Sequence, residues 1–385
     1  MDKLQEYISK RIGNSFILWF KQSNRWIHFE EPAWFVNSLY QQGVDRQVIS
    51  GKLSRKYKLP AQECHAFVNE ICDGILKFSV PFVADGPDLD NSLDSKNYFF
   101  RPYSVRHYLI ANKRIAINFE SRRSEYYIHP PLANLENRNA EESDFQIDIF
   151  EYKTIPVFRE TRNTVNFFAC EDFMQLRNKL YIYLCNFLYH KTEKDWMSFI
   201  HASAVTDGKE TILLSSSSGS GKSTMAAMLQ TSGLRVVSDD FVPIDVKTKK
   251  AYPFPAGLSV KEGAFDLLNP HYRDLKNSKY NQYEYQHPSI RYIPLEISDS
   301  SYFRPKLVKN IVFIGYSPDK TCEFKQLSID ESLKLFHEQA WVTRTTEHAR
   351  AFLNWFVKLR CFRLEYGNTE EGINKVMSLF ESHIN

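Results

Sequence analysis

Residues 215–224 read Ser-Ser-Ser-Ser-Gly-Ser-Gly-Lys-Ser-Thr, between an apolar run at 211–214 and the run Met-Ala-Ala-Met-Leu at 225–229. A strand, a glycine-rich loop ending in Lys-Ser and a helix, in this order, are typical of a phosphate-binding loop. The glycines let backbone N–H groups turn toward an anion, and the helix N-terminus adds partial positive charge. In such a loop the lysine reaches the β- and γ-phosphates of ATP, and the serine hydroxyl ligates Mg²⁺. The sequence therefore predicts that ATP and Mg²⁺ bind here, through Ser218, Gly219, Ser220, Gly221, Lys222, Ser223 and Thr224.

Ser216 departs from the usual pattern, which has glycine at the first position of the loop. Serine tolerates fewer backbone angles than glycine does. The alternative interpretation is a flexible Ser/Gly linker that happens to contain a lysine. Because a linker would not lie between a strand and an Ala/Met/Leu helix, the sequence favours the phosphate-binding loop.

The composition is that of an ordinary globular protein with two or three domains: of 385 residues, 43% are hydrophobic and 25% are charged. The net charge of +3 is too small to indicate nucleic-acid binding. The sequence contains no long uncharged apolar segment, so we expect no transmembrane helix. Residues 1–6 lack the apolar core of a signal peptide. The six cysteines form no Cys-x-x-Cys pair, so we expect reduced thiols, no zinc site and a cytoplasmic protein.

Residues 1–80 predict a small separate domain. Two β-like runs at 16–20 and 26–29 flank Gln-Ser-Asn at 22–24, which indicates a hairpin. Three helical patterns follow, and Pro60 opens the third of them. A hairpin with three helices predicts a winged-helix domain. Such a domain can bind DNA, but the basic residues of its second helix lie mostly at the end of that helix.

Two segments connect this domain to the phosphate-binding loop. Residues 84–97 are rich in Asp, Gly, Pro and Ser without periodicity, which predicts a linker. Residues 98–197 predict an α+β scaffold with short strands and a helix at 173–188.

The catalytic domain is predicted to span residues 198–385. Residues 199–205 have the pattern of one strand, and a second β-like run at 234–238 ends in Asp239-Asp240. A strand, helix and strand of this length predict a parallel, right-handed crossover. The carboxyl end of a strand beside a phosphate-binding loop is where α/β proteins hold metal and substrate. The two aspartates are therefore candidate catalytic residues.

Three runs together carry a family resemblance: His-Ala-Ser-Ala-Val at 201–205, Ser-Gly-Ser-Gly-Lys-Ser-Thr at 218–224 and Val-Ser-Asp-Asp at 237–240. They resemble the HPr kinase/phosphorylase superfamily, whose core is related to phosphoenolpyruvate carboxykinase. Later stretches resemble its subgroup associated with lasso-peptide and related clusters; these lie at 252–255, 291–294 and 361–367. The resemblance implies an α/β P-loop kinase core of HPr kinase type.

The order of elements in residues 1–80 resembles the PqqD-like peptide-recognition domain found with enzymes that modify ribosomal peptides. The matching features are Glu-Glu-Pro-Ala-Trp at 30–34, which opens a helix, and the break Gly-Val-Asp at 43–45. Such domains hold a leader peptide as an added strand on the hairpin edge. The alternative is a helical cap that packs on the kinase.

The resemblance also implies roles for the site residues. Lys222 holds ATP, while Asp239 acts as the base and Ser223 and Asp240 hold Mg²⁺. The opposite assignment, with Asp240 as the base and Asp239 as the metal ligand, stays open. His201 contacts an aspartate or the transferring phosphate, unless it is a strand histidine whose ring is satisfied by the backbone.

Two further cations, Lys261 and Arg291, are candidates for neutralising a phosphate, although either can be a solvated surface residue. The tyrosine-rich stretch 272–291 is predicted to be a loop that covers the site, or else a surface insertion. A capping box at 328–331 predicts the start of a structural helix.

The sequence thus predicts an ATP- and Mg²⁺-dependent kinase for a Ser or Thr hydroxyl of a ribosomally synthesised peptide, whose leader binds residues 1–80. No nucleic-acid or membrane partner is expected, and the family resemblance implies a homo-oligomer. The alternatives are a kinase for a small metabolite such as free serine, a nucleotide-binding sensor or scaffold without turnover, and a DNA-binding regulator.

Overall fold

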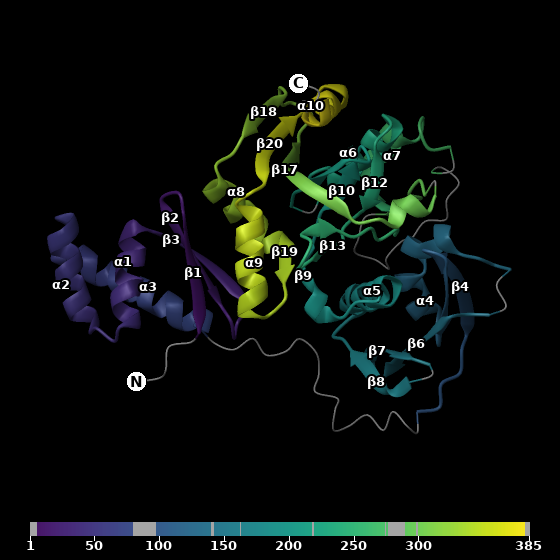
Figure 1. Cartoon of the computed structure of the whole chain (residues 1–385), viewed down its shortest axis with the longest axis horizontal. Helices are drawn as coiled ribbons and strands as arrows, with labels where there is room; N and C mark the ends of the chain where they lie inside the picture. The colour runs from purple at the N-terminus through teal and green to yellow at the C-terminus, as the bar shows by residue number, and fades with distance from the viewer. Residues whose placement is uncertain are drawn as a thin grey trace. The chain divides into compact units, whose positions relative to one another are not determined.

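The computed structural model describes residues 6–79, 98–139, 142–161, 163–217, 219–273, 275, 289–297 and 299–381 (Figure 1). The predicted linker at 84–97 lies outside the described residues. The chain forms two units, one of Met1–Ala84 with Leu327–Cys361 and the other of Asp85–Gln326 with Phe362–Asn385. The predicted boundary of the catalytic domain was therefore wrong in one respect, because residues 327–361 fold with the N-terminal unit.

The first unit contains an antiparallel sheet in the order β1 (Tyr7–Ile12), β2 (Ser15–Phe20), β3 (Arg25–Glu30). Strands β2 and β3 confirm the predicted hairpin, whereas β1 was missed. Three helices follow and confirm the predicted patterns; they are α1 (Glu31–Gln41), α2 (Arg46–Tyr57) and α3 (Ala61–Ser79). The predicted capping box is also present, since Ser328 and Glu331 exchange hydrogen bonds at the start of α8 (Ile329–Phe336).

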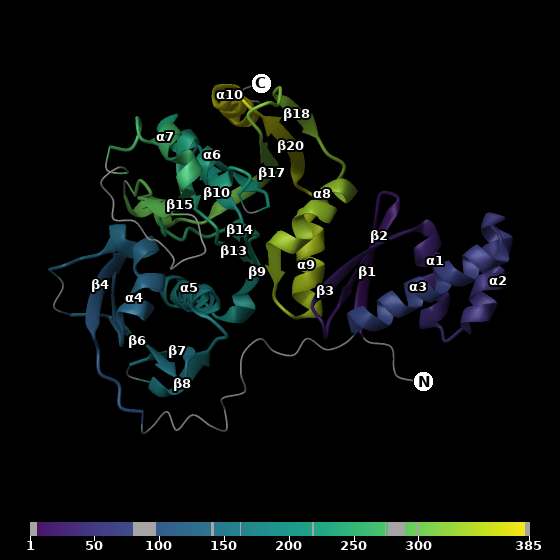
Figure 2. The ribbon, with the colours of Figure 1, turned by 180° about the vertical axis from the view of Figure 1, so that it is seen from behind.

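The sheet of the first unit is buried on both faces. Because side chains alternate along a strand, Leu18 and Phe20 share one face, where they pack against Ala33 of α1 and Ile75 of α3. On the other face, the Trp26 ring lies 5.6 Å from that of Phe352 in α9 (Thr346–Phe356). Figures 1 and 2 show β1–β3 between α1 and α3 on one side and α9 on the other. The helices from 327–361 therefore complete the core of the N-terminal unit.

The second unit contains two larger sheets. The scaffold sheet has the order β4-β5-β6-β7-β8, with β5 and β6 parallel; its strands are β4 (Ser104–Ile110), β5 (Lys113–Phe119), β6 (Phe145–Tyr152), β7 (Ile155–Glu160) and β8 (Asn163–Ala169). Helices α4 (Arg122–Ile128) and α5 (Phe173–Tyr189) pack on it, and their core continues into Trp196, Phe241 and Phe254. The scaffold sheet and the segment around β9 and β13 therefore share one core.

The predicted phosphate-binding loop follows β11 of the other sheet, which runs β12-β10-β11-β17-β14-β13-β9, with β20 beside β17 and β18 beside β20. Its strands are β9 (Trp196–Ile200), β10 (Ser203–Thr206), β11 (Glu210–Ser215), β12 (Arg235–Ser238), β13 (Val242–Asp245), β14 (Lys250–Ala251), β17 (Lys306–Tyr316), β18 (Glu323–Gln326) and β20 (Arg360–Tyr366). Helices α6 (Lys222–Thr231) and α10 (Thr369–Glu381) pack on one face of it through Leu229 and Val376.

Strands β11 and β12 flank the helix α6 in the sequence. Both pair antiparallel with β10, so they run parallel to each other with β10 between them. The predicted parallel arrangement is confirmed, but the two strands are not neighbours.

The remaining elements are β15 (Leu258–Lys261) paired with β16 (Ile290–Ile293), α7 (Phe265–Leu268) and β19 (Ala340–Val342). No helix in the described part of the chain is long and apolar enough to cross a membrane.

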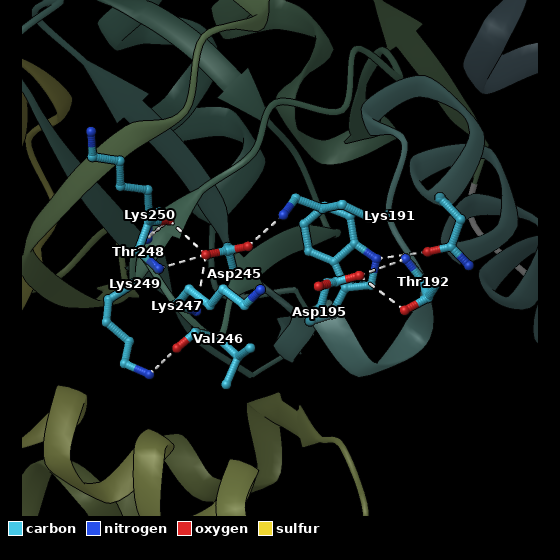
Figure 3. Close-up of polar contacts among 11 residues, drawn as sticks. Lys191, Thr192, Asp195, Asp245, Val246, Lys247, Thr248, Lys249 and Lys250 are labelled. Carbon is cyan, nitrogen blue, oxygen red and sulfur yellow. Dashed lines mark hydrogen bonds and ion pairs between the residues drawn. The ribbon is translucent and has the colours of Figure 1, made fainter.

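Asp245 at the end of β13 fixes the turn into β14 (Figure 3). Its buried carboxylate accepts hydrogen bonds from Thr248, at 2.6 Å from the backbone N–H and 2.8 Å from the hydroxyl. It also accepts one from the amine of Lys191 at 2.5 Å. That amine lies 4.9 Å from the centre of the Tyr252 ring. One carboxylate therefore ties the turn to the segment that follows α5.

We expect Asp245→Asn to lower the free energy of unfolding by about 1.5–3 kcal/mol at neutral pH, the usual contribution of a hydrogen bond to a charged group. Burial raises the pKa of Asp245, but the hydrogen bonds from Lys191 and Thr248 outweigh it and hold the pKa below 3.8. A lowered folded-state pKa stabilises the protein above the unfolded-state pKa, and this stabilisation is lost as pH falls through the folded-state value. The difference between wild type and variant should thus shrink below about pH 4.

Urea unfolding at a series of pH values measures this difference. Asp319→Asn is the matched control, because Asp319 is exposed and its substitution removes the same charge. An unfolding free energy for Asp245→Asn equal to that of the control at pH 7 would contradict the assignment.

Candidate functional site

The site lies between two antiparallel strand pairs of the large sheet, β10 with β12 and β9 with β13. Strand β10 pairs with β12 through Ala204 and Ser238, and β9 pairs with β13 through Ile200 and Val242. The pairing register is the same in the two pairs. Continuing it places residues 201–203 opposite residues 239–241.

The predicted single strand at 199–205 was therefore wrong. The structure has two strands, β9 and β10, and they end and begin on either side of His201-Ala202. The Ala202 N–H donates to the Ile200 carbonyl at 3.0 Å instead of to a neighbouring strand. Asp240 opposite has a φ of 58°, in the left-handed region that aspartate tolerates better than most residues. Because of this break, His201 and Asp240 lie outside the paired strands, and their side chains contact each other.

The predicted phosphate-binding loop joins β11 to α6. Gly219 and Gly221 have φ values of 88° and 91°, which only glycine adopts without strain. Gly221 is the N-cap residue of α6, and no side chain caps the helix there. The backbone N–H groups in the first turn of a helix have no acceptor within the helix. In α6 no capping side chain accepts their hydrogen bonds. Of the predicted loop residues, Ser218 lies outside the described residues.

Lys222 and Ser223, the first residues of α6, contact the aspartate pair. The Lys222 amine donates to Asp240 Oδ1 at 2.5 Å, and the Ser223 hydroxyl donates to Asp239 Oδ1 at 3.1 Å. His201 Nε2 lies 3.1 Å from the same Asp240 oxygen. The structure thus brings together residues from three separate parts of the sequence, namely the β9–β10 break, the loop and the end of β12.

The two aspartates have different surroundings. The Asp239 residue is 4% exposed, and its carboxylate also accepts hydrogen bonds from the Ser203 hydroxyl and from the Ser259 N–H, the latter at 2.9 Å. The Asp240 side chain is 43% exposed. Asp239 is therefore a buried carboxylate held by several hydrogen bonds. Asp240 is partly exposed to solvent and contacts Lys222 and His201.

These surroundings move the two carboxyl pKa values apart. Burial, together with the negative charge of Asp240, raises the pKa of Asp239 above its ordinary value. Desolvation also raises the pKa of Asp240, but the positive charge of Lys222 and the hydrogen bond to His201 outweigh it, so the pKa is lowered. Pairs of carboxyl groups with separated pKa values often divide acid, base and ligand roles between them.

The residues present fit a nucleotide with Mg²⁺. A Cβ atom added to Gly221 would lie 3.3 Å from the Tyr316 Cβ, so the loop is shaped for a glycine backbone at this position. The Ser223 hydroxyl and the aspartate oxygens are the hard oxygen donors that Mg²⁺ prefers. Within the described residues no group of three or more His, Cys, Asp or Glu side chains could hold a metal ion. Mg²⁺ at a kinase site needs no such group, since substrate phosphates and water supply most of its ligands.

The remaining predicted residues lie at different distances from this cluster. Ser220 closes the loop, because its hydroxyl lies 2.8 Å from that of Ser217, and Thr224 is half-buried in the first turn of α6. Lys261 lies on β15 two residues from Ser259, on the same side of that strand. Arg291 is different, because it is buried and its guanidinium lies 4.4 Å from the Phe265 ring centre. The alternative of a solvated surface residue was therefore wrong for Arg291, and its role in neutralising a phosphate stays a prediction.

Most of the predicted covering loop at 272–291 lies outside the described residues. Two further residues, Ser203 and Ser259, hold Asp239 and were not predicted from the sequence. Ser203 lies within the run that carries the family resemblance, and its position beside His201 was a usable signal. No sequence signal marks Ser259, because it contacts Asp239 only through its backbone.

Comparisons with known proteins add no identification. No protein-family model matches the chain, and no curated protein matches it.

Proposed function

We propose that the protein is a kinase that transfers the γ-phosphoryl group of Mg²⁺-ATP to a hydroxyl group. The observation that carries this proposal is the meeting of Lys222, Ser223 and the aspartate pair at the end of a phosphate-binding loop. Phosphoryl transfer depends mainly on positioning and on neutralising charge, and this cluster supplies groups for both.

The contacts favour specific roles. The loop N–H groups and Lys222 would hold the phosphates, and Ser223 with Asp239 would hold Mg²⁺, because these two already contact each other at 3.1 Å. This reverses the assignment first predicted from the sequence, in which Asp240 was on the metal side. When bound, Mg²⁺ would neutralise phosphate charge and favour the ionised form of Asp239.

Asp240 is then the general base. Its carboxylate is exposed, and its lowered pKa keeps it ionised at neutral pH. It would accept the proton of the acceptor hydroxyl while the hydroxyl oxygen forms a bond to the γ-phosphorus and the bond from that phosphorus to the β–γ bridging oxygen breaks, which releases ADP. His201, at 3.1 Å from Asp240, would orient this carboxylate.

We further propose that the hydroxyl belongs to a Ser or Thr of a ribosomally synthesised peptide. In support, β1 is an edge strand of the first unit's sheet, where an extended peptide can add a strand. An open cavity of about 430 Å³ is lined in part by this strand, through residues 10–13 of β1 and its turn, and in part by residues 328–330 and 357. A leader peptide on β1 would bring the acceptor peptide to this chain.

Measurement of ADP release with Mg²⁺-ATP tests the proposal. The acceptors are a panel of leader-bearing Ser/Thr peptides, the same peptides without leader, and free hydroxyl metabolites including serine. We expect release that requires a peptide and falls when the leader is removed, with phosphate found on Ser or Thr by mass spectrometry. The Lys222→Ala variant is the control for contaminating kinases.

The other outcomes separate the alternatives. Release with free serine alone would contradict the peptide part and favour a metabolite kinase. ATP binding without ADP release from any acceptor would favour a nucleotide sensor. Absence of ATP binding would contradict the kinase proposal as a whole.

A further inference from the structure

Tyr316, the last residue of β17, stands at the mouth of the phosphate-binding loop. We infer that its ring is the stacking platform for the nucleobase, and hence that the site selects nucleoside triphosphates over inorganic polyphosphate. This inference rests on the proposed function and deepens it, since it assigns the part of the site that recognises the nucleoside.

Tyr316 is positioned by the sheet. Strand β17 runs parallel to β11, so both strands deliver their carboxyl ends to the same edge, where β11 enters the loop. The Tyr316 N–H donates to the Ser220 carbonyl at 3.3 Å. A Cβ atom added to Gly221 would lie 3.3 Å from the Tyr316 Cβ and 3.5 Å from the Tyr366 hydroxyl. The side chain of Tyr316 therefore starts in direct contact with the loop that would hold the phosphates.

The order of strands gives the direction in which a bound nucleotide would extend. In the sheet, β11 lies between β10 and β17. The aspartates follow β12, on the β10 side of β11, and Asp239 is held there by Ser203 at the start of β10. The reacting end of a bound triphosphate must face Asp240. Its nucleoside end therefore leaves the loop on the opposite side, where β17 ends in Tyr316.

The exposure of Tyr316 suits this role. The residue is 48% exposed although its backbone belongs to a central strand. Its ring is tilted by 58° against the ring of Tyr366, with 5.4 Å between their centres, and Tyr366 is almost fully buried. Tyr366 thus supports Tyr316 at an inclined angle and does not cover it as a parallel stacking partner would. A nucleobase can stack on an aromatic face of this kind whatever its identity, because every base has a π-face.

The test compares two probes by isothermal titration calorimetry: Mg²⁺-ATP, and Mg²⁺ with inorganic tripolyphosphate. We expect Tyr316→Ala to weaken ATP binding by about 5- to 150-fold, the range of one lost base–aromatic stack, and to leave tripolyphosphate binding unchanged. Tyr316→Phe should retain ATP binding. The alanine variant keeps the Cβ atom, which lies beside the Gly221 position, so only the ring is removed.

Tyr103→Ala is the matched control, because Tyr103 is also exposed and lies before β4 in the same unit. It should leave the affinity for both probes unchanged. Equal weakening of both probes by Tyr316→Ala would overturn the inference, since the ring would then act on the loop. Unchanged ATP affinity in Tyr316→Ala would overturn it while leaving the kinase proposal intact. If the wild-type protein binds neither probe, the phosphate site and this inference fail together.

Discussion

We expect Asp240→Asn to lower the turnover number for phosphoryl transfer by about 10²–10⁴-fold, the usual contribution of a positioned general base. The amide has nearly the shape of the carboxylate but cannot accept the proton of the acceptor hydroxyl. Asp240 is the exposed member of the pair and is held by Lys222 and His201, so it is the carboxylate that an acceptor can reach. ADP release at saturating ATP and acceptor measures the effect.

Asp239→Asn is the matched comparison, because it removes the same charge from the neighbouring position. Its carboxylate contacts Ser223, so this variant should raise the Mg²⁺ concentration needed for half-maximal rate. One outcome would contradict the assignment of Asp240 as the general base. If Asp240→Asn keeps nearly full turnover while Asp239→Asn is inactive at saturating Mg²⁺, Asp239 is the base. Calorimetry with Mg²⁺-ATP shows whether each variant still binds nucleotide.

We expect Phe352→Ala to destabilise the first unit by about 3–5 kcal/mol, the usual cost of truncating a buried aromatic residue. Phe352 in α9 is fully buried and packs against Trp26 of β3 and against Phe336 and Phe356. These contacts join residues 327–361 to the N-terminal sheet. Chemical unfolding followed by tryptophan fluorescence measures the loss.

A double-mutant cycle with Trp26→Ala tests the same contact directly. The two rings lie 5.6 Å apart, so their coupling should be about 0.5–1.5 kcal/mol. Phe119→Ala, at an equally buried position in the second unit, should be additive with Trp26→Ala. Additivity of Phe352→Ala with Trp26→Ala would contradict the placement of α9 on the sheet.

The placement of α9 changes how leader recognition should be tested. Deletion of residues 1–80 would remove the strands that cover Phe352 and leave an apolar helix face in water. Loss of activity in that deletion would therefore not distinguish leader binding from unfolding. Removal of the leader from the peptide leaves the protein intact and avoids this ambiguity.

Local sequence patterns predicted most of the regular elements. Helices α3 and α5 have apolar residues at spacings of three and four, and the structure contains them at those positions. The pattern failed at β1, whose residues Ser9, Lys10 and Arg11 give a weak strand signal. That strand forms because β2 supplies a hydrogen-bonding partner along its whole length. It also failed at 199–205, where an uninterrupted run of strand-forming residues contains a break at His201-Ala202.

The sequence by itself determined the loop, its glycines and the Lys-Ser pair, because the backbone angles and the helix start depend on neighbouring residues. It also determined that Asp239-Asp240 ends a strand near the loop. Only the tertiary structure decided which aspartate contacts which partner. Adjacent residues in extended chain point to opposite sides, so the register of β12 against β10 turns Asp239 toward Ser203 and Ser223, and the left-handed Asp240 toward Lys222 and His201. Register and long-range packing join residues far apart in the sequence, and no local pattern encodes them.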